Sequence, residues 1–304
     1  MPPTDQTSSK QIEMKFAYIG YKVQEKYSQG VNNDEDSELL FFLKDKGLQI
    51  DFVVWNDNAI NWKNYDVILI KSPWDYHENI SLFYTWLEKI KSIGQRMLNP
   101  IDIIKWNSNK HYLDDIFKAG LPIIPSIYLD KGTQILSYNS LFKQLNTDKI
   151  VVKPCISASA KNTIILDEES IVQQSDAINL LLSEEEYIVQ PFVKEISDGE
   201  WSFIFFNEQY SHCALKVPKQ GDFRVQHHHG GSILYPEPKL KHIQQAEKYI
   251  QKFARGTLYA RVDAVVINDT LFLMEIELIE PYLFLNSVKE RQELYYQALV
   301  RLTS

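Results

Sequence analysis

Hydrophobic residues in the N-terminal third of the chain alternate between two patterns. Short runs rich in β-branched and aromatic residues occupy 15–21, 48–55 and 65–72, and such runs are typical of buried strands. Helical spacing separates them, and the amphipathic stretch 79–94 ends on Gly94, as many helices do. Strands that alternate with helices favour a parallel sheet covered by helices. The pattern therefore predicts an α/β domain over residues 1–98.

Beyond residue 98 the spacing predicts a mixed α+β arrangement. A short helix should follow Ser108 or Asn109 as its cap, and a hairpin should turn at Asn207-Glu208. Further strands are expected at 123–129, 149–154, 162–166, 187–193, 259–267 and 271–280, and further helices near 168–182, 239–256 and 286–302. We place domain boundaries near 98 and 196, which gives domains of 1–98, 99–195 and 196–304. The charge run 32–38 is interpreted as a solvated loop and helix start.

The stretch "LFLMEIELIE" (271–280) combines a buried-strand pattern with three glutamates, Glu275, Glu277 and Glu280. Removing an ionised carboxylate from water costs several kcal/mol unless a cation meets it. The preceding strand, "YARVDAVVI", supplies Arg261 and Asp263. If a three-residue turn joins the two strands, Asp263 lies opposite Glu275 and Arg261 opposite Glu277. All four side chains then share one face of the sheet.

Three carboxylates this close repel one another unless cations lie among them. Hard oxygen ligands, few per ion, favour Mg²⁺ completed by water and phosphate. Two alternatives remain open: Arg261 alone neutralises the acids, or solvent covers the face. A one-residue change of register would also separate the group by turning one strand over.

Two other stretches are suited to a phosphate-bearing ligand. Lys153 ends the run "VVKP" and is followed by the small-residue loop "SASAKNT", which would let backbone N–H groups approach phosphate. The run "YIVQPFV" breaks at a proline and could hold a flat ring, although an ordinary core strand explains it equally well. Neither a G-x-x-x-x-G-K-[ST] loop nor a G-x-G-x-x-G fingerprint is present.

Composition restricts the class of protein. The chain has 304 residues, a formal net charge of −8 and a pI near 5.5, so the electrostatic footprint of a nucleic-acid-binding protein is absent. No run approaches the length of a membrane span, and the polar start lacks a secretory signal. Two cysteines are too few for a disulfide framework. These features predict a reduced, cytoplasmic, soluble protein.

The ordered motifs "KSPWDY", "LNP…NSNK", "VVKP", "VQPFV…GEWS", "GDFRVQ…GG", "YARVD" and "MEIELIEP" resemble those of ATP-grasp enzymes. The chain is most similar to the glutathione synthetase-like branch and, within it, to ligases that form D-cycloserine. The resemblance covers about residues 65–285. It implies an N-terminal α/β domain that helps to bind the acceptor substrate, and two α+β lobes that enclose ATP.

The resemblance also implies roles for individual residues. It assigns Asp263, Glu275 and Glu277 to magnesium, with two ions expected and Mn²⁺ as an alternative. Arg261, Lys216 and Arg224 would stabilise the transferred phosphoryl group and the acyl phosphate. The ATP-binding set would be Lys110, Lys153, the loop residues Ser157 and Ser159, the adenine segment Gln190, Pro191, Phe192 and Val193, and Glu200 for the ribose with Glu195 as alternative.

The residues that would bind the acceptor substrate are less well defined. Asp75 and Tyr76 would contact the acceptor substrate, or else form a turn around a buried tryptophan. Glu280 would touch the substrate amine, or simply end the strand. The histidines at 227–229 are interpreted as part of a loop that covers the substrate rather than as a metal site. Two departures are notable: Glu277 replaces an asparagine of many relatives, and the phosphate loop lacks glycine.

The implied reaction joins a carboxylate to an amine on a small amino acid or peptide. ATP phosphorylates the carboxylate, and the amine displaces phosphate from the acyl phosphate. Ring closure within one molecule is the narrower form of this hypothesis. A phosphotransferase and a non-catalytic nucleotide-binding protein are the rivals, and a homodimer stays open.

Overall fold

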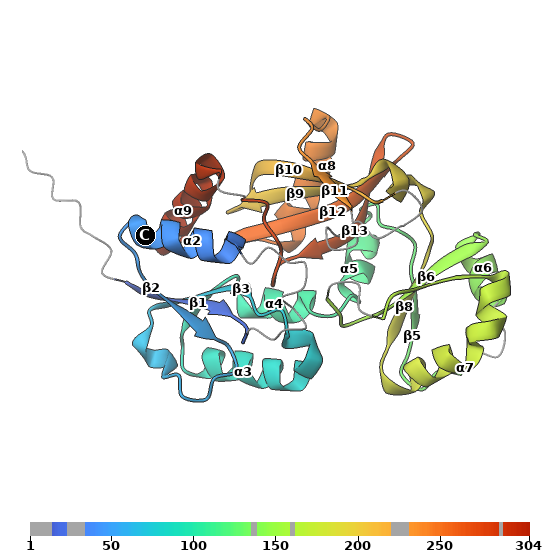
Figure 1. The fold of residues 1–304 in the computed structure, drawn as a ribbon, viewed down its shortest axis with the longest axis horizontal. Helices are drawn as coiled ribbons and strands as arrows, with labels where there is room; N and C mark the ends of the chain where they lie inside the picture. Colours follow the sequence, from blue (N-terminus) through green and yellow to red (C-terminus); the bar gives the residue numbers. More distant parts are fainter. Residues whose placement is uncertain (1–13, 23–33, 135–138, 159–161, 220–230, 286–287) are drawn as a thin grey trace, which may run out of the picture.

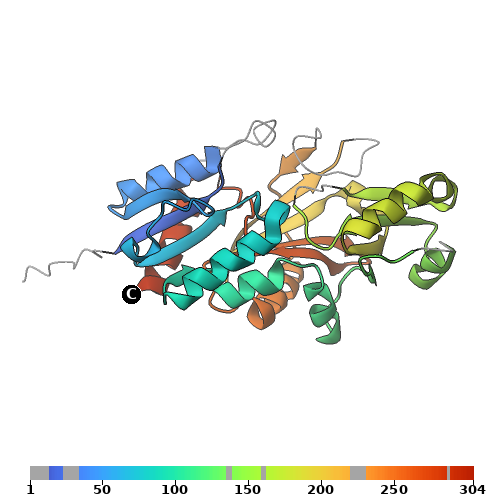
Figure 2. The same ribbon diagram turned by 90° about the horizontal axis from the view of Figure 1, so that it is seen from below.

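The computed structural model describes residues 14–22, 34–134, 139–158, 162–219, 231–285 and 288–304. Its strands form three sheets, and each sheet uses strands from one part of the chain. In two perpendicular views, the five-stranded sheet lies between the other two (Figures 1 and 2). None of the described helices combines the length and the apolar character that crossing a membrane requires.

The N-terminal sheet is parallel, as predicted. Its order is β2-β1-β3-β4, with β1 (Lys15–Gly20), β2 (Gln49–Val54), β3 (Val67–Ser72) and β4 (Arg96–Leu98). Leu39 and Leu43 of α2 (Asp34–Asp45) pack on one face, and α3 (Ile80–Ser92) packs Phe83 and Leu87 on the other. The short helices η1 (Trp62–Asn64) and η2 (Tyr76–Asn79) complete this part.

The second sheet is antiparallel and has the order β5-β8-β6-β7. It contains β5 (Ile127–Leu129), β6 (Lys149–Pro154), β7 (Ile164–Asp167) and β8 (Tyr187–Pro191), and it packs against α6 (Asn139–Leu145) and α7 (Glu168–Glu184). The strand predicted at 123–129 is shorter than expected. Ile123 instead forms an isolated bridge to Leu273 of the neighbouring sheet.

The third sheet is also antiparallel, with the order β11-β10-β9-β12-β13. Its strands are β9 (Glu200–Phe206), β10 (Gln209–Val217), β11 (Ser232–Leu234), β12 (Tyr259–Ile267) and β13 (Thr270–Glu277). The helix α8 (Leu240–Phe253) packs Tyr249 and Ile250 against it. The short helix η3 (Lys194–Asp198) precedes β9, and α9 (Lys289–Thr303) closes the chain beside α2.

Two local predictions are wrong. The expected helix cap at Ser108 or Asn109 is replaced by two helices, α4 (Ile101–Asn107) and α5 (Tyr112–Lys118). Ser108 ends α4, and His111 precedes α5 without a capping side-chain hydrogen bond. The charge run 32–38 is not simply solvated, because the side chain of Glu35 is only 3% exposed and pairs with Lys71 of β3. The domain boundaries at 98 and 196 stay a prediction.

Candidate active site

The hairpin of β12 and β13 carries the acid cluster, and its register has two parts. Asn268 and Asp269 both have positive φ and form a two-residue turn, so that Ile267 pairs with Thr270. The predicted three-residue turn is therefore wrong. A β-bulge between Asp263 and Ala264 then shifts the pairing by one residue. Beyond it Asp263 lies opposite Glu275 and Arg261 opposite Glu277, as predicted.

The three acids converge on one point. Asp263, Glu275 and Glu277 each present a carboxylate oxygen within 4.8 Å of the others. Asp263 is almost fully buried, and the two glutamates are partly buried. Oxygen atoms this close, from three carboxylates on one sheet face, match the ligand set of a hard divalent cation.

Arg261 lies within this cluster and is itself buried. Its Nε and Nη2 donate to Asp263 at 3.0 and 2.8 Å, Nη2 also contacts Glu277, and Nη1 donates to the Tyr282 carbonyl at 3.0 Å. Burial lowers the pKa of Arg261, but the surrounding carboxylates outweigh burial and hold it above its ordinary value. The guanidinium is therefore charged and fixed in orientation.

Lys216 joins the cluster to β9. Its Nζ donates to Asp263 Oδ2 at 3.1 Å and forms a second ion pair with Glu200. Ser202 of β9 donates a 2.6 Å hydrogen bond to the other oxygen of Asp263. Burial raises the pKa of Glu200, and Lys216 opposes this change. Lys216 thus bridges Glu200, the predicted ribose ligand, and Asp263 of the acid cluster.

Arg261 and Lys216 do not reach all of the acids. These two cations contact three carboxylates, from Asp263, Glu200 and Glu277, whereas Glu275 lies in the same cluster without such a contact. Among the described residues, no hydrogen bond or ion pair reaches the Glu275 carboxylate. Burial and the neighbouring carboxylates raise the pKa of Glu277 well above its usual value, although Arg261 opposes them. The three carboxylates therefore offer the ligand set of a divalent cation, and Arg261 is not the only cation beside them, because Lys216 also pairs with Asp263.

The outer edge of β13 is held by side chains that sequence reasoning missed. Asn107 donates to the carbonyl of Ile276 at 2.7 Å and accepts from the N–H of Leu278 at 3.0 Å. The Tyr112 hydroxyl accepts from the Ile276 N–H at 2.9 Å. These bonds fix the strand segment that carries Glu275 and Glu277. The available signal was the polar run "NSNK" directly after an apolar helix, where a buried asparagine needs a backbone partner.

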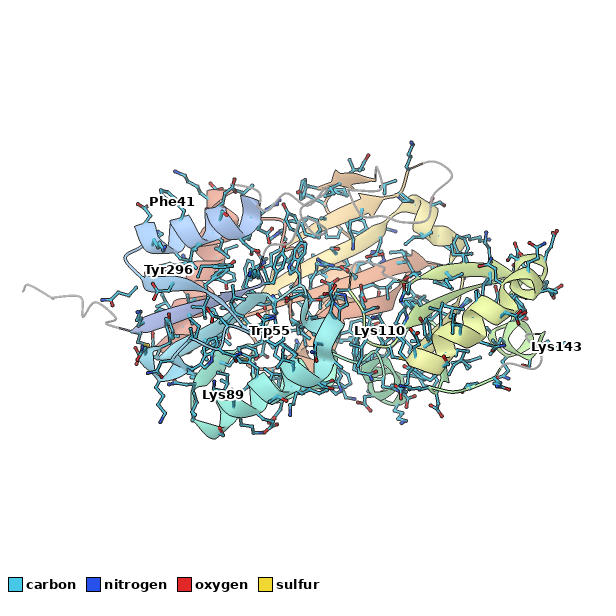
Figure 3. All side chains as sticks on the ribbon, turned by 60° about the horizontal axis from the view of Figure 1, so that its bottom comes forward. Phe41, Trp55, Lys89, Lys110, Lys143 and Tyr296 are labelled. Atoms are coloured by element: carbon cyan, nitrogen blue, oxygen red, sulfur yellow. The ribbon has the colours of Figure 1, made fainter. Side chains whose placement is uncertain are left out.

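The two predicted phosphate-binding lysines lie beside the acids. Lys110 donates to the hydroxyl and carbonyl of Ser157 at 3.0 and 3.3 Å, and it lies near the middle of the molecule in Figure 3. Burial lowers the pKa of Lys153, and the charges of Glu275 and Lys110 act on it in opposite directions. Lys153 donates no hydrogen bond to any described residue, so its ammonium group has free donors.

The predicted adenine segment begins in the last two residues of β8 and continues beyond it, at the junction of the two antiparallel sheets. Gln190 is buried and donates to Ser126 at 2.9 Å. Phe192 and Val193 pack in a small apolar cluster with Val265 and Met274. Met274 is the extra residue of the bulge, since its neighbours Leu273 and Glu275 face consecutive residues of β12. Apolar side chains thus lie next to the acids along one hairpin.

The predicted substrate residues differ in how closely they meet the acids. Tyr76 is buried, and burial together with the charges of Glu280, Glu277 and Glu275 raises its pKa well above the usual value. Burial and the nearby Glu275 raise the pKa of Glu280 to about 8. Asp75 instead accepts a 2.6 Å hydrogen bond from the indole of the buried Trp55, whereas Trp74, the tryptophan of the predicted turn itself, is only partly buried.

Several predicted residues make no described contact with the site. Glu195 lies partly buried in η3. Ser159, Arg224 and the histidines at 227–229 lie outside the described residues. Burial raises the pKa of the Cys155 thiol to about 12, which fits the interpretation that it is not a nucleophile.

The fold and this arrangement of acids and cations define the ATP-grasp class of enzymes. The family model described as "Prokaryotic glutathione synthetase, ATP-grasp domain" matches residues 132–291, more than half of the chain. The model of the D-cycloserine synthetase N-terminal domain matches residues 18–99. The chain therefore belongs to the prokaryotic glutathione synthetase family of ATP-grasp domains, as the motif order predicts.

Known relatives agree with this assignment. The cycloserine biosynthesis protein DcsG of Streptomyces lavendulae is 24% identical over 277 residues, covering 83% of this chain and 88% of that protein. The crystal structure of D-cycloserine synthetase DcsG has a TM-score of 0.80 at 22% identity and covers 94% of this chain and 99% of that one. D-alanine–D-alanine ligase from Bacillus anthracis has a TM-score of 0.71 at 14% identity, with 95% and 98% coverage. The protein is thus an ADP-forming ligase that makes amide bonds with ATP.

Proposed function

We propose that this ligase joins the carboxylate and an amine of a small amino acid or peptide through an acyl phosphate, and that both groups belong to one molecule. The product is then a ring. The similarity over 83% of the chain to a cycloserine biosynthesis protein supports ring closure. The net charge of −8 favours a small-molecule substrate over a nucleic acid.

Asp263, Glu275 and Glu277 would hold two Mg²⁺ ions, with Mn²⁺ able to replace them. The convergence of the three carboxylates, with Glu275 outside the ion pairs of Arg261 and Lys216, supports this assignment. Bound magnesium would offset the charge of the β- and γ-phosphates. Arg261, fixed by Asp263 and the Tyr282 carbonyl, presents its charge where the transferred phosphoryl group becomes more negative.

Lys110 and Lys153 would bind the ATP phosphates, together with the loop that contains Ser157. Lys153 is suited to this role because its ammonium group donates to no described residue and is subject to the charges of Glu275 and Glu200. Gln190, Pro191, Phe192 and Val193 would hold the adenine against the apolar cluster that includes Met274. Glu200 would accept hydrogen bonds from the ribose hydroxyls.

The substrate would lie between the acids and the N-terminal sheet. Burial and the charges of the acids raise the pKa values of Tyr76 and Glu280, so both residues would border this space. Its carboxylate oxygen attacks the γ-phosphorus, the bond to the β-phosphate oxygen breaks, and ADP leaves. The amine then attacks the acyl carbon, loses a proton, and expels phosphate. Lys216 and Arg261 stabilise the oxyanion of the tetrahedral intermediate. Glu280, whose pKa is raised by burial and by Glu275, would contact the amine.

The convergence of three carboxylates with Arg261 and Lys216 carries this proposal. The test is ADP release from ATP and Mg²⁺ against amino acids of both configurations and dipeptides, comparing wild type with Glu275→Gln. The exposed Glu237→Gln serves as the matched control. We expect substrate-dependent ADP release to fall at least a hundredfold in Glu275→Gln and to be unchanged in Glu237→Gln.

Mass spectrometry of the product separates the possible reactions. A product lighter than the substrate by one water indicates ring closure, and a product containing two substrate units indicates joining of two molecules. A product that retains the phosphoryl group would show a phosphotransferase instead. Equal ADP release by wild type and Glu275→Gln would contradict the assigned metal role.

A further inference from the structure

A second group of metal-binding side chains lies outside the acid cluster. His111, Cys155 and Glu186 each offer a ligand atom within 4.8 Å of the other two. They come from three places in the chain: the residue before α5, the loop after β6, and the residue before β8. His111 and Glu186 are partly exposed, whereas Cys155 is buried.

The chemistry of this group differs from that of the acid cluster. It combines a sulfur, an imidazole nitrogen and a carboxylate oxygen, which suits Zn²⁺ rather than Mg²⁺. His111 Nε2 lies 3.4 Å from Glu186 Oε2. Nitrogen and oxygen ligands about 2.0–2.2 Å from a tetrahedral zinc lie about 3.3–3.6 Å apart. The observed separation therefore matches one edge of a zinc tetrahedron.

The backbone around these residues is already fixed. The N–H of Cys155 donates to the Glu186 carbonyl at 2.9 Å, and the N–H of Lys110 donates to the Cys155 carbonyl at 2.9 Å. The ring of His111 stacks on Tyr128, with centroids 4.2 Å apart and planes 18° apart. The two hydrogen bonds fix the backbone at Cys155 against Glu186 and Lys110, and the ring contact fixes the imidazole of His111. Little backbone ordering is therefore needed when an ion binds.

We propose that His111, Cys155 and Glu186 form a zinc site, with water as the fourth ligand. It adjoins the loop of Ser157 and the neighbouring Lys110, so bound zinc would stiffen the part of the protein that we assign to ATP phosphates. The zinc site itself does not depend on that assignment. Ligation replaces the Cys155 S–H bond by a sulfur–zinc bond and releases one proton to solvent.

The experiment uses Co²⁺ as a probe, because a cobalt–thiolate bond gives a near-ultraviolet charge-transfer band that oxygen and nitrogen ligands do not produce. Full-length, tag-free, reduced protein is titrated with Co²⁺ and then with Zn²⁺. We expect one equivalent of Co²⁺ to produce the band and one equivalent of Zn²⁺ to remove it, since zinc binds such sites more tightly.

The variants identify the ligands. Cys155→Ser should abolish the band, whereas Cys213→Ser, a change at the other buried cysteine, should keep it. Glu275→Gln should also keep it, which separates this site from the acid cluster. His111→Ala changes a partly exposed residue and should weaken Co²⁺ binding at least tenfold without threatening the fold. No band in wild type, a band that survives in Cys155→Ser, or equal affinity in His111→Ala would overturn the proposal.

Discussion

At the scale of single residues, Asp263 shows how the site keeps a buried carboxylate ionised. Burial raises its pKa, but Arg261, Lys216 and Ser202 outweigh burial and hold the pKa well below its ordinary range. Three different donors therefore serve one side chain that is 1% exposed. Such an acid contributes stability that is present at neutral pH and is lost as the pH falls through its depressed pKa.

Removing one of the donors to Asp263 should lower the stability of the protein at neutral pH. Ser202→Ala deletes the 2.6 Å hydrogen bond to Asp263 and should cost about 1.5–3 kcal/mol, the usual contribution of a hydrogen bond to a charged group. Urea unfolding at neutral pH measures the loss. The Mg²⁺ concentration needed for activity should also rise. Ser197→Ala, at an exposed serine of η3, is the control, and equal stability losses in both variants would contradict the argument.

Glu280 should make stability depend on pH in the opposite sense. Its pKa is about 8 in the folded chain against an ordinary value of 4.5. Between these values the folded protein holds a proton that the unfolded chain has lost, so the free energy of unfolding falls as the pH rises through this window. At about 1.4 kcal/mol per pKa unit, the effect amounts to a few kcal/mol.

Glu280→Gln should remove most of the decline in the free energy of unfolding with rising pH. Chemical unfolding in the presence of a chelator, on both sides of the window, measures it. The difference between variant and wild type should grow in favour of Glu280→Gln as the pH approaches 8. Glu237→Gln, at an exposed site, should follow wild type throughout. Parallel curves for wild type and Glu280→Gln would refute the raised pKa.

At the scale of secondary structure, the β12–β13 hairpin shows what the sequence could and could not predict. Alternation of side chains correctly assigned Arg261 and Asp263 to one face. The turn was taken one residue too long, and the bulge was not foreseen. These two errors cancel, because the bulge adds the residue that the turn lacks. A bulge depends on how Met274 packs against Phe192 and Val193, and that packing is absent from a local pattern.

Other differences between prediction and structure have the same physical origin. The strands and long helices followed from hydrophobic periodicity, which reflects burial of one face. A role for Asn107 does not follow from the sequence because its partners, Ile276 and Leu278, lie far along the chain. Glu35 looked solvated because its cation, Lys71, lies in a different element. Long-range pairing of buried polar groups is therefore the information that a single sequence did not provide.

Asn107 offers a test at this scale. Asn107→Leu leaves the Ile276 carbonyl and the Leu278 N–H without their side-chain partner, and each buried orphan costs about 1–3 kcal/mol. We expect lower stability and, because β13 carries Glu275 and Glu277, a severalfold higher KM for the magnesium nucleotide. Asn58→Leu, at an exposed asparagine of the N-terminal domain, is the control for altered polarity. An unchanged KM in Asn107→Leu would show that the strand edge does not position the acids.

At the scale of the whole molecule, the segment after β13 connects the active site to the N-terminal sheet. Lys71 donates to the Pro281 carbonyl at 3.1 Å, and Glu35 accepts from the N–H groups of Leu283 and Leu285 at 2.8 and 3.0 Å. Arg261 holds the same segment from the other side, through the Tyr282 carbonyl. Arg261 and the N-terminal domain therefore both fix the backbone of residues 281–285.

A buried ion pair makes this connection sensitive to mutation. Lys71 is 1% exposed and contacts Glu35 at 3.3 Å and Asp36 at 3.1 Å. Burial lowers the pKa of Lys71, yet these two carboxylates raise it above the ordinary value, so the ammonium group is charged. Burial raises the pKa of Glu35, but at Asp36 burial is outweighed by Lys71, Ser72 and Tyr18, which lower the pKa of that carboxyl, so the pair with Asp36 is ionised. Taking away one partner of a buried pair leaves an uncompensated charge and typically costs about 3–5 kcal/mol.

Lys71→Met should therefore destabilise the protein by about 3–5 kcal/mol in chemical unfolding. Lys15→Met, which breaks the exposed pair with Asp51 in the same sheet, should cost far less, because solvent screens exposed ion pairs. Adding Glu35→Gln to Lys71→Met removes one of the orphaned charges and should recover part of the loss. If the segment also positions Arg261, the surviving Lys71→Met protein should show a lower kcat at saturating substrate, whereas Lys15→Met should not. Equal stability and equal kcat in the two single variants would mean that the N-terminal sheet does not hold the segment on which Arg261 depends.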